Sequence, residues 1–366
     1  MRMPIMVANN LNWAASRLYL GGSGVDELDA GASPGGISID SLAKARLLIV
    51  TGKGGVGKTT ICGALSLAAQ RAGKRVLLVE VGTKENISAL FGADPLGYDP
   101  KPLTDGIDGM LLDPYLALQE YMVGQIKIKA VVRFVVENNV FRYLVGVAPG
   151  WRELITLGKI WVMEGLTRGK RDTRPLYDLV VVDAPATGHG ISFLKVPKVV
   201  LDVLKFGPIK HYTKMVQGLL LDEKRTRLLI VSLPEEMPVN EALEIYHASR
   251  DFLKIPLGPL LLNCMYPALG GPGLESTLKK LERGNGPKLP SNSKELINAN
   301  ALKAAARAYQ ERRRVQLESA QRLESEVDLN VVHIPYVFTN RFDLDTLKRI
   351  SGFVGGPFDA GEEDSG

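Results

Sequence analysis

The sequence predicts an α/β domain with a doubly wound, mostly parallel β-sheet and an inserted helical subdomain. Six short apolar runs are spaced widely along the chain, and none shows the polar alternation of a half-exposed strand. Such runs are typical of strands buried on both faces, and the long segments between them suit crossover helices. The runs are residues 47–50 (LLIV), 76–79 (VLLV), 179–182 (LVVV), 228–231 (LLIV), 259–262 (PLLL) and 331–334 (VVHI).

Composition divides the chain into three parts. Residues 1–40 end in a stretch rich in Gly, Pro and Ser, which predicts a flexible leader. Residues 41–355 predict one folded domain, and residues 356–366 predict a short acidic tail. Hydrophobic residues make up 45% of the chain and charged residues 23%, so the domain has enough apolar material for a sizeable core.

Helical patterns interrupt the regular alternation of strands and crossovers in two places. We expect a helical insertion at about residues 100–175, with helix-compatible apolar stretches at 111–147 and 151–166. Residues 295–327 are rich in Ala, Leu, Glu and Arg and contain neither Pro nor Gly. This composition predicts one long helix near the end of the domain.

A glycine-rich loop follows the first predicted strand. Residues 52–60 read GKGGVGKTT and match the pattern GxxxxGK[ST] directly before a predicted helix. Such a loop curls its backbone N–H groups around phosphates, and the helix N-terminus adds positive potential. Lys58 is expected to reach the β- and γ-phosphates of ATP, and Thr59 to ligate Mg²⁺. The predicted nucleotide-binding residues here are Gly54, Gly55, Val56, Gly57, Lys58, Thr59 and Thr60. The fold class is therefore refined to a P-loop NTPase fold.

Lys53 adds a second lysine near the start of this loop, which makes it a deviant Walker A motif. In ATPases with this form, the extra lysine faces the nucleotide of a partner subunit across a dimer interface. There it stabilises charge in trans, as an arginine finger does. The alternative interpretation is a solvated loop lysine. We assign Lys53 and Lys58 as candidate catalytic residues.

Residues 180–194, VVVDAPATGHGISFL, resemble the second switch of the arsenical-pump ATPase family, which includes the ATPases that target tail-anchored membrane proteins. The resemblance implies that Asp183, at the end of a buried strand, holds Mg²⁺ through water and belongs to the catalytic set. The other matching switch positions are Pro185, Thr187, Gly188 and His189.

The resemblance extends over about residues 45–350. Asn263, at the end of the fifth apolar run, matches the adenine-contacting asparagine of the family, and Pro335 matches the start of its adenine loop. Residues 148–160 resemble its Pro-Gly-x-x-Glu helix. These matches imply that ATP and Mg²⁺ are the cofactors and that the protein acts as a dimer.

The first switch departs from the family pattern. Gly82 stands where the family usually has an aspartate that orients the attacking water. Glu80, two residues earlier, is the candidate catalytic carboxylate in this segment, and Glu85 is a more distant substitute. We therefore expect slow hydrolysis, or hydrolysis that depends on a partner subunit.

Several partner and site classes are excluded by the sequence. The 45 basic and 40 acidic residues give a net charge of +5 without a concentrated basic patch, which argues against nucleic acid. Cys62 and Cys264 are the only cysteines, too few for a three-thiolate arsenite site or for a disulfide framework. No apolar run reaches the ~18 residues of a membrane span, so we expect a cytoplasmic protein without stable membrane insertion.

Three functions remain open at this stage. The first is an ATP-hydrolysing dimer, a homodimer or a heterodimer with a paralogous ATPase, whose nucleotide state controls an apolar groove for a protein client. The second is a weakly hydrolysing subunit that regulates a paralogous ATPase, which Gly82 favours. The third is a partition or positioning ATPase, which shares the deviant loop but fits the switch at residues 180–194 less well.

Overall fold

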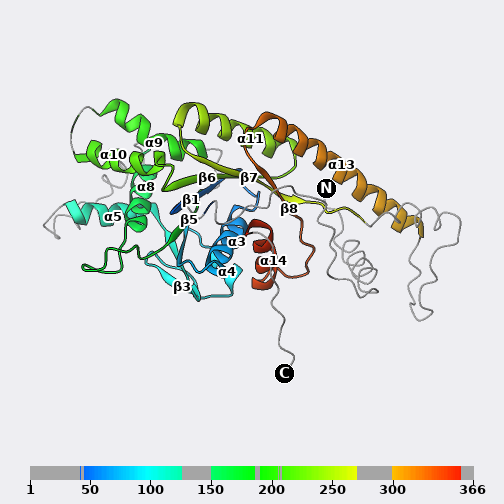
Figure 1. The fold of residues 1–366 in the computed structure, drawn as a ribbon, viewed down its shortest axis with the longest axis horizontal. Helices are drawn as coiled ribbons and strands as arrows, with labels where there is room; N and C mark the ends of the chain where they lie inside the picture. Colours follow the sequence, from blue (N-terminus) through cyan, green and yellow to red (C-terminus); the bar gives the residue numbers. More distant parts are fainter. Residues whose placement is uncertain are drawn as a thin grey trace, which may run out of the picture.

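The computed structural model describes residues 42, 45–125, 150–185, 190–204, 206, 208–269 and 299–355, and the structural statements below concern these residues. They form one eight-stranded sheet with helices on both faces (Figure 1). The strand order is β3-β4-β2-β5-β1-β6-β7-β8, and all neighbouring strands except β3 and β4 are parallel. The predicted α/β class with a mostly parallel sheet is confirmed. The leader at 1–40 and the tail at 356–366 lie outside the described residues.

All six predicted strands are present. They are β1 (Leu47–Thr51), β2 (Val76–Val81), β5 (Leu179–Asp183), β6 (Thr226–Ser232), β7 (Leu257–Met265) and β8 (Val331–Pro335). Every residue of β1, β2 and β5 is buried. Apolar residues at successive positions therefore reflect burial on both faces, as the sequence indicated.

The predicted start of the helical insertion, at about residue 100, is wrong. Residues 101–112 instead form the hairpin β3 (Lys101–Thr104) and β4 (Ile107–Leu112), and β4 pairs in parallel with β2. The dipeptide Asp105-Gly106 makes the turn, with Gly106 at a φ of +74°. Asp-Gly is a strong hairpin signal. The apolar run that begins near Met110 therefore belongs first to the sheet and only afterwards to a helix.

One face of the sheet is covered by three helices (Figure 1). They are α3 (Lys58–Arg71), α4 (Ile87–Phe91) and α14 (Leu344–Gly355). Side chains such as Val50, Leu78 and Val181 point to this face and pack with Ile61 and Leu347 in one buried cluster. The helix predicted after the glycine-rich loop is therefore confirmed as α3, which connects β1 to β2.

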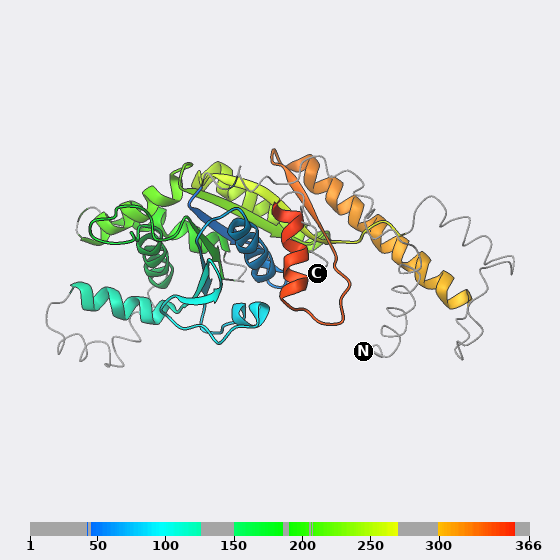
Figure 2. The same cartoon turned by 60° about the horizontal axis from the view of Figure 1, so that its bottom comes forward.

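The other face is covered by two groups of helices (Figures 1 and 2). The first comprises α5 (Pro114–Gln125), α8 (Trp151–Glu164), α9 (Gly190–Val203) and α10 (Pro208–Leu221). The second comprises α11 (Glu236–His247) with the π-turn η1 (Ala248–Leu253), and α13 (Ala299–Glu326). α8 and α13 match the helices predicted at 151–166 and 295–327, whereas α5 covers only part of the stretch predicted at 111–147. Among the described residues, no helix combines the length and hydropathy needed to cross a lipid bilayer.

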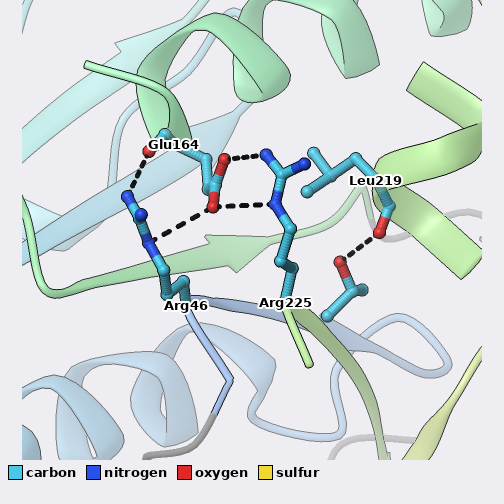
Figure 3. Close-up of polar contacts among 5 residues, drawn as sticks. Arg46, Glu164, Leu219 and Arg225 are labelled. Carbon is cyan, nitrogen blue, oxygen red and sulfur yellow. Dashed lines mark hydrogen bonds and ion pairs between the residues drawn. The ribbon is translucent and has the colours of Figure 1, made fainter. Parts of the chain in front are cut away.

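A buried ion-pair cluster joins α8 to the amino ends of two central strands (Figure 3). Glu164, the last residue of α8, pairs with Arg46 before β1 and with Arg225 before β6. Arg46 Nη2 also donates to the main-chain oxygen of Glu164 at 2.6 Å. Next to this cluster, Thr226 Oγ1 donates to Leu219 O at 2.7 Å and ties α10 to β6 (Figure 3). The helical layer is thus anchored at the amino edge of the sheet.

The strand order reverses at β1, and the carboxyl ends of the strands lie opposite this ion-pair cluster. The chain runs from β1 towards β2 on one side and later from β5 to β6 on the other side of β1. In open α/β sheets, ligands bind outside the carboxyl ends of the strands at such a reversal. The segment that leaves β1 at this point is the glycine-rich loop at residues 52–57.

Candidate functional site

The loop after β1 has a backbone that requires glycine at two tight contacts. Gly52 and Gly57 have φ values of +145° and +90°, which L-residues with side chains seldom adopt. A Cβ at Gly52 would lie 2.2 Å from Val231 O, and a Cβ at Gly57 would lie 2.4 Å from Asn263 Nδ2. The loop is therefore packed against β6 and β7, and its curvature is set by the glycines of the motif.

Lys58 begins α3 and turns back over this loop. Its Nζ donates to Gly52 O at 3.0 Å and to Lys53 O at 2.8 Å. Burial lowers the pKa of the Lys58 amine, while the nearby negative charge of Asp183 acts in the opposite direction. The amine is held at the mouth of the loop, where it can serve as a counter-charge for a phosphate.

Thr59 and Asp183 meet beside the loop, although they are far apart in sequence. Thr59 Oγ1 donates to Asp183 Oδ2 at 2.6 Å. The other carboxylate oxygen, Oδ1, is buried and has no hydrogen-bond partner among the described residues. Burial raises the pKa of Asp183 to about 6, although Thr59 and Lys58 favour the ionised form. A hydroxyl beside a carboxylate oxygen that lacks a partner fits Mg²⁺, which binds proteins through few side chains and completes its shell with phosphates and water.

Glu80 lies opposite Asp183 in the register of β2 and β5. Its carboxylate accepts hydrogen bonds from Asn86 N at 2.8 Å, Asn86 Nδ2 at 2.7 Å and Ile87 N at 3.1 Å. Glu80 therefore caps the N-terminus of α4 and holds the first-switch segment beside Asp183. Its role as a catalytic residue stays a prediction.

The remainder of the first switch contains Glu85 and Gly82. Glu85 accepts hydrogen bonds from the backbone N–H and the hydroxyl of Ser88, so it is a second cap of α4. Gly82 is half-buried, and its φ lies outside the left-handed region. The atom nearest to a Cβ at Gly82 would be Lys84 O, at 3.8 Å. A larger side chain is therefore accommodated at this position.

Asn263 and Pro335 lie at the ends of the neighbouring strands β7 and β8. Asn263 Nδ2 donates to Val56 O at 2.9 Å, so this buried amide supports the glycine-rich loop directly. Pro335 pairs in register with Met265, and Tyr336 N donates to Met265 O at 2.7 Å. The structure thus brings Asn263 to the loop. Its predicted contact with adenine and that of Pro335 stay predictions.

The outer side of the loop lines a surface hollow of about 380 Å³. Its lining residues are Lys53, Gly54, Gly55, Val56, Leu233, Glu235, Glu236, Met237 and Pro238. Gly54 and Gly55 are exposed, and Lys53 and Thr60 are half-buried. The acidic pair Glu235 and Glu236, at the start of α11, was missed in the sequence. Its position four residues after a predicted strand was the available signal.

The second switch is described only in part. Asp183 ends β5 and Pro185 is half-buried two residues later. Thr187, Gly188 and His189, which carry the rest of the sequence resemblance, lie outside the described residues.

Comparisons with known proteins agree with this geometry. The family model described as anion-transporting ATPase (ArsA) matches residues 45–218. ATPase BagA of Mycobacterium tuberculosis is 34% identical over 247 residues, covering 65% of this chain and 72% of that protein. ATPase GET3 of Lachancea thermotolerans is 31% identical over 170 residues, 44% of this chain and 48% of that protein. An arsenical pump-driving ATPase of Escherichia coli is 27% identical over 239 residues, 60% of this chain and 40% of that protein. With the glycine-rich loop, Lys58 and the Thr59–Asp183 pair at the carboxyl edge of its sheet, the chain belongs to the anion-transporting ATPase family.

Proposed function

We propose that this protein binds ATP with Mg²⁺, hydrolyses the nucleotide, and changes state as a dimer in response. The observation that carries the proposal is the Thr59–Asp183 pair beside Lys58, in which the buried Asp183 Oδ1 has no partner among the described residues. Such an arrangement is costly in a purely structural site because a buried charge requires compensation. A bound Mg²⁺, held by Thr59 and Asp183, would supply that compensation.

Different residues would hold different parts of the nucleotide. The backbone from Gly54 to Thr60 forms the cradle, and Lys58 supplies the monovalent counter-charge. Thr59 and Asp183 would hold Mg²⁺, which neutralises charge on the phosphates during transfer. Glu80 keeps the first switch next to this centre through its contacts with α4.

The position of Lys53 supports the dimer. Its main-chain oxygen is used by Lys58 of the same loop, whereas the residue itself lines the surface hollow. A lysine placed outside the cradle and at the surface suits contact with the nucleotide of a partner subunit. The partner is a second copy or a paralogous ATPase.

Exposed apolar side chains on α9, on α10 and between these helices support the handling of a protein client. Val203 is 73% exposed and Phe206 is 87% exposed, and Val199 and Met215 are exposed near them in sequence. α9, which carries Val199 and Val203, begins at Gly190 within the second switch, so a change in that switch would move this surface. We propose that the helical subdomain, which begins with α5 after β4, presents this surface to an apolar segment.

Gly82 favours a second candidate, a weakly hydrolysing subunit that regulates a paralogous ATPase. The first switch keeps Glu80 and Glu85, but both carboxylates cap α4. Because residue 82 is glycine, this position provides no carboxylate to orient the attacking water.

The decisive experiment measures binding, hydrolysis and size on one preparation of the full chain. Calorimetry with Mg²⁺ and ATP should show binding, phosphate release should show turnover, and light scattering should show a larger species with a non-hydrolysable ATP analogue than with ADP. A lack of ATP binding would reject the proposal. Binding with turnover only after a paralogue is added would favour the regulatory candidate.

A further inference from the structure

The end of β7 contains a backbone feature that the nucleotide site as described does not explain. Cys264, directly after Asn263, has a φ of +61°. Among the described residues that are not glycine, only Lys254 shares a positive φ, and it occupies the C-cap of η1, where this conformation is common. Cys264 has no such cap position. Left-handed backbone at a residue with a side chain is disfavoured, so surrounding contacts must hold it.

Those contacts come from one face of α13. Gln316 Nε2 donates to Cys264 O at 3.2 Å, and Gln316 Oε1 accepts from Tyr266 N at 2.7 Å. Arg313 Nε donates to Tyr266 O at 3.1 Å, and Tyr309 Oη donates to Pro267 O at 2.9 Å. The three side chains are four and three residues apart, which places them on one helix face. They satisfy four backbone groups of the segment 264–267, where β7 shifts register against β8 and ends at Met265.

Aromatic stacking fixes the same segment to the end of β8. The rings of Tyr266 and Tyr309 stack with centroids 5.0 Å apart, and Tyr336 meets Tyr266 edge-on at 5.5 Å. Phe338 lies 4.8 Å from Tyr336. α13, the end of β7 and the end of β8 are therefore held together by both hydrogen bonds and ring contacts.

This assembly reaches the glycine-rich loop through the side chain of Asn263. Asn263 precedes Cys264, and its amide donates to the buried Val56 O and fills the space in front of Gly57. Asn263 and Cys264 share a peptide unit, so a change of the backbone at Cys264 would disturb the position of Asn263. A loss of the left-handed conformation at Cys264 would turn the strand end and withdraw the amide from the loop.

We propose that α13 is a positioning element of the nucleotide site, and that Gln316 and Arg313 hold Cys264 in its left-handed conformation so that Asn263 supports the loop at Val56. This inference rests on the proposed ATP site. It assigns control of that site to α13, which lies outside the glycine-rich loop and both switches. α13 is anchored on the sheet near Ala320 and Leu323, and its N-terminal turns run beyond the edge of the sheet (Figures 1 and 2). Because coupling between two sites is reciprocal, ATP at the loop stabilises the contacts of α13 with residues 264–267.

The first test compares Gln316→Ala and Arg313→Ala with the matched control Arg314→Ala. Arg314 is the exposed neighbour of Arg313 and pairs only with Glu311 and Glu318 in the described contacts. Gln316→Ala should weaken ATP affinity about tenfold, because two hydrogen bonds are lost, and Arg313→Ala should weaken it less. In protein without nucleotide, Gln316→Ala should also speed amide exchange in residues 52–60 while the central strands keep their protection. Arg314→Ala should change neither quantity.

A rescue experiment separates the conformational role from simple loss of packing. In the Gln316→Ala background, Cys264→Gly should restore most of the ATP affinity, because glycine adopts the left-handed conformation freely. Cys264→Ala in the same background should restore none. Equal affinity and exchange in Gln316→Ala and wild type would overturn the inference, as would equal results for the glycine and alanine double variants. A wild type that binds no ATP would reject the proposed function instead, and the exchange measurement would still test the link from α13 to the loop.

Discussion

Two buried carboxylates at opposite ends of the sheet are treated differently by their surroundings. Glu164, at the amino edge, has a side chain that is 1% exposed, and both of its oxygens pair with guanidinium groups of Arg46 and Arg225 (Figure 3). Asp183, at the carboxyl edge, has one oxygen bonded to Thr59 and another without a partner among the described residues. The hydrogen bond from Arg225 to Glu164 accordingly raises the pKa of Arg225, whereas burial raises the pKa of Asp183.

The contrast separates a buried carboxylate whose oxygens are both paired from one whose surroundings leave an oxygen without a partner. A buried acid whose oxygens are all paired contributes through its partners, and removing it leaves their charges uncompensated. A buried acid with one orphaned oxygen destabilises the protein until a cation arrives. Substitutions at the two edges should therefore have opposite effects on stability and on binding.

The largest effect is expected for Lys58→Ala. This substitution removes the buried amine that the loop holds between Gly52 O and Lys53 O, so phosphate loses its monovalent counter-charge. ATP affinity should fall by at least about 10³-fold, or about 4 kcal/mol. Calorimetry checks the affinity. Lys53→Ala is the control and should leave ATP affinity nearly unchanged, since its proposed target lies across the dimer interface. Unchanged affinity in Lys58→Ala would contradict the assignment of the loop, and Lys53→Ala with normal turnover and normal dimer closure would contradict the in-trans role.

Asp183→Asn should stabilise the metal-free protein at neutral pH. The folded pKa of about 6 exceeds the ordinary value of 3.8, so the folded state holds the proton more tightly than the unfolded state. The contribution of Asp183 to stability is therefore most favourable below about pH 4, falls as the pH rises to about 6, and is constant above. The gain from the asparagine should grow over this range to at most about 3 kcal/mol.

Denaturant unfolding in the presence of a chelator, at pH 4, 5, 6 and 7, checks this dependence. The same variant should bind Mg²⁺ with ATP much more weakly than wild type, because the neutral amide is a poor ligand for a hard cation. A constant stability difference between pH 4 and pH 7 would show that Asp183 does not titrate in this range.

Glu164→Gln should do the reverse, lowering stability without affecting nucleotide binding. Breaking a buried pair usually costs about 3–5 kcal/mol, but the two arginine side chains are about a third exposed, at 35% and 36%, so about 2 kcal/mol is expected. Glu311→Gln is the matched control, because that ion pair with Arg314 is exposed on both sides and should matter by less than about 1 kcal/mol. Denaturant unfolding measures both variants. A loss of ATP affinity in folded Glu164→Gln would show that the two edges are not independent.

The same contrast explains which features of the fold and of the site could be predicted from the sequence alone. Short apolar runs predicted all six parallel strands because burial on both faces leaves a pattern in local composition. The glycine-rich loop was predicted because its spacing is fixed by phosphate geometry. The hairpin at 101–112 was missed although Asp105-Gly106 signals it, since the following apolar residues also suit a helix.

Contacts between distant segments left no comparable trace. Nothing near Gln316 in the sequence indicates that its amide bonds both Cys264 O and Tyr266 N, because this depends on how α13 lies over β7. Glu80 was assigned to the switch on its charge, but its use as a cap of α4 depends on the turn that follows β2. The partners of Glu164 likewise precede two different strands. Side chains that satisfy the backbone of remote segments therefore required the structure.

The smallest effect is expected at Gly82, in the first switch after the carboxyl end of β2. The backbone there is not left-handed, and a Cβ would meet nothing closer than Lys84 O at 3.8 Å, so Gly82→Asp should fold without strain. A carboxylate that orients water and accepts its proton contributes about 10²–10⁴-fold in evolved sites. An aspartate introduced without its usual surroundings should recover only part of this, about a tenfold rise in turnover, or about 1.4 kcal/mol.

Single-turnover phosphate release measures the rate, and Gly82→Asn is the matched control because it has the same shape without the charge. A rise in both variants would assign the effect to loop rigidity. Brisk turnover of the unmodified protein that is lost in Glu80→Gln would assign the water-orienting role to Glu80, so that the first switch is complete without an aspartate at position 82.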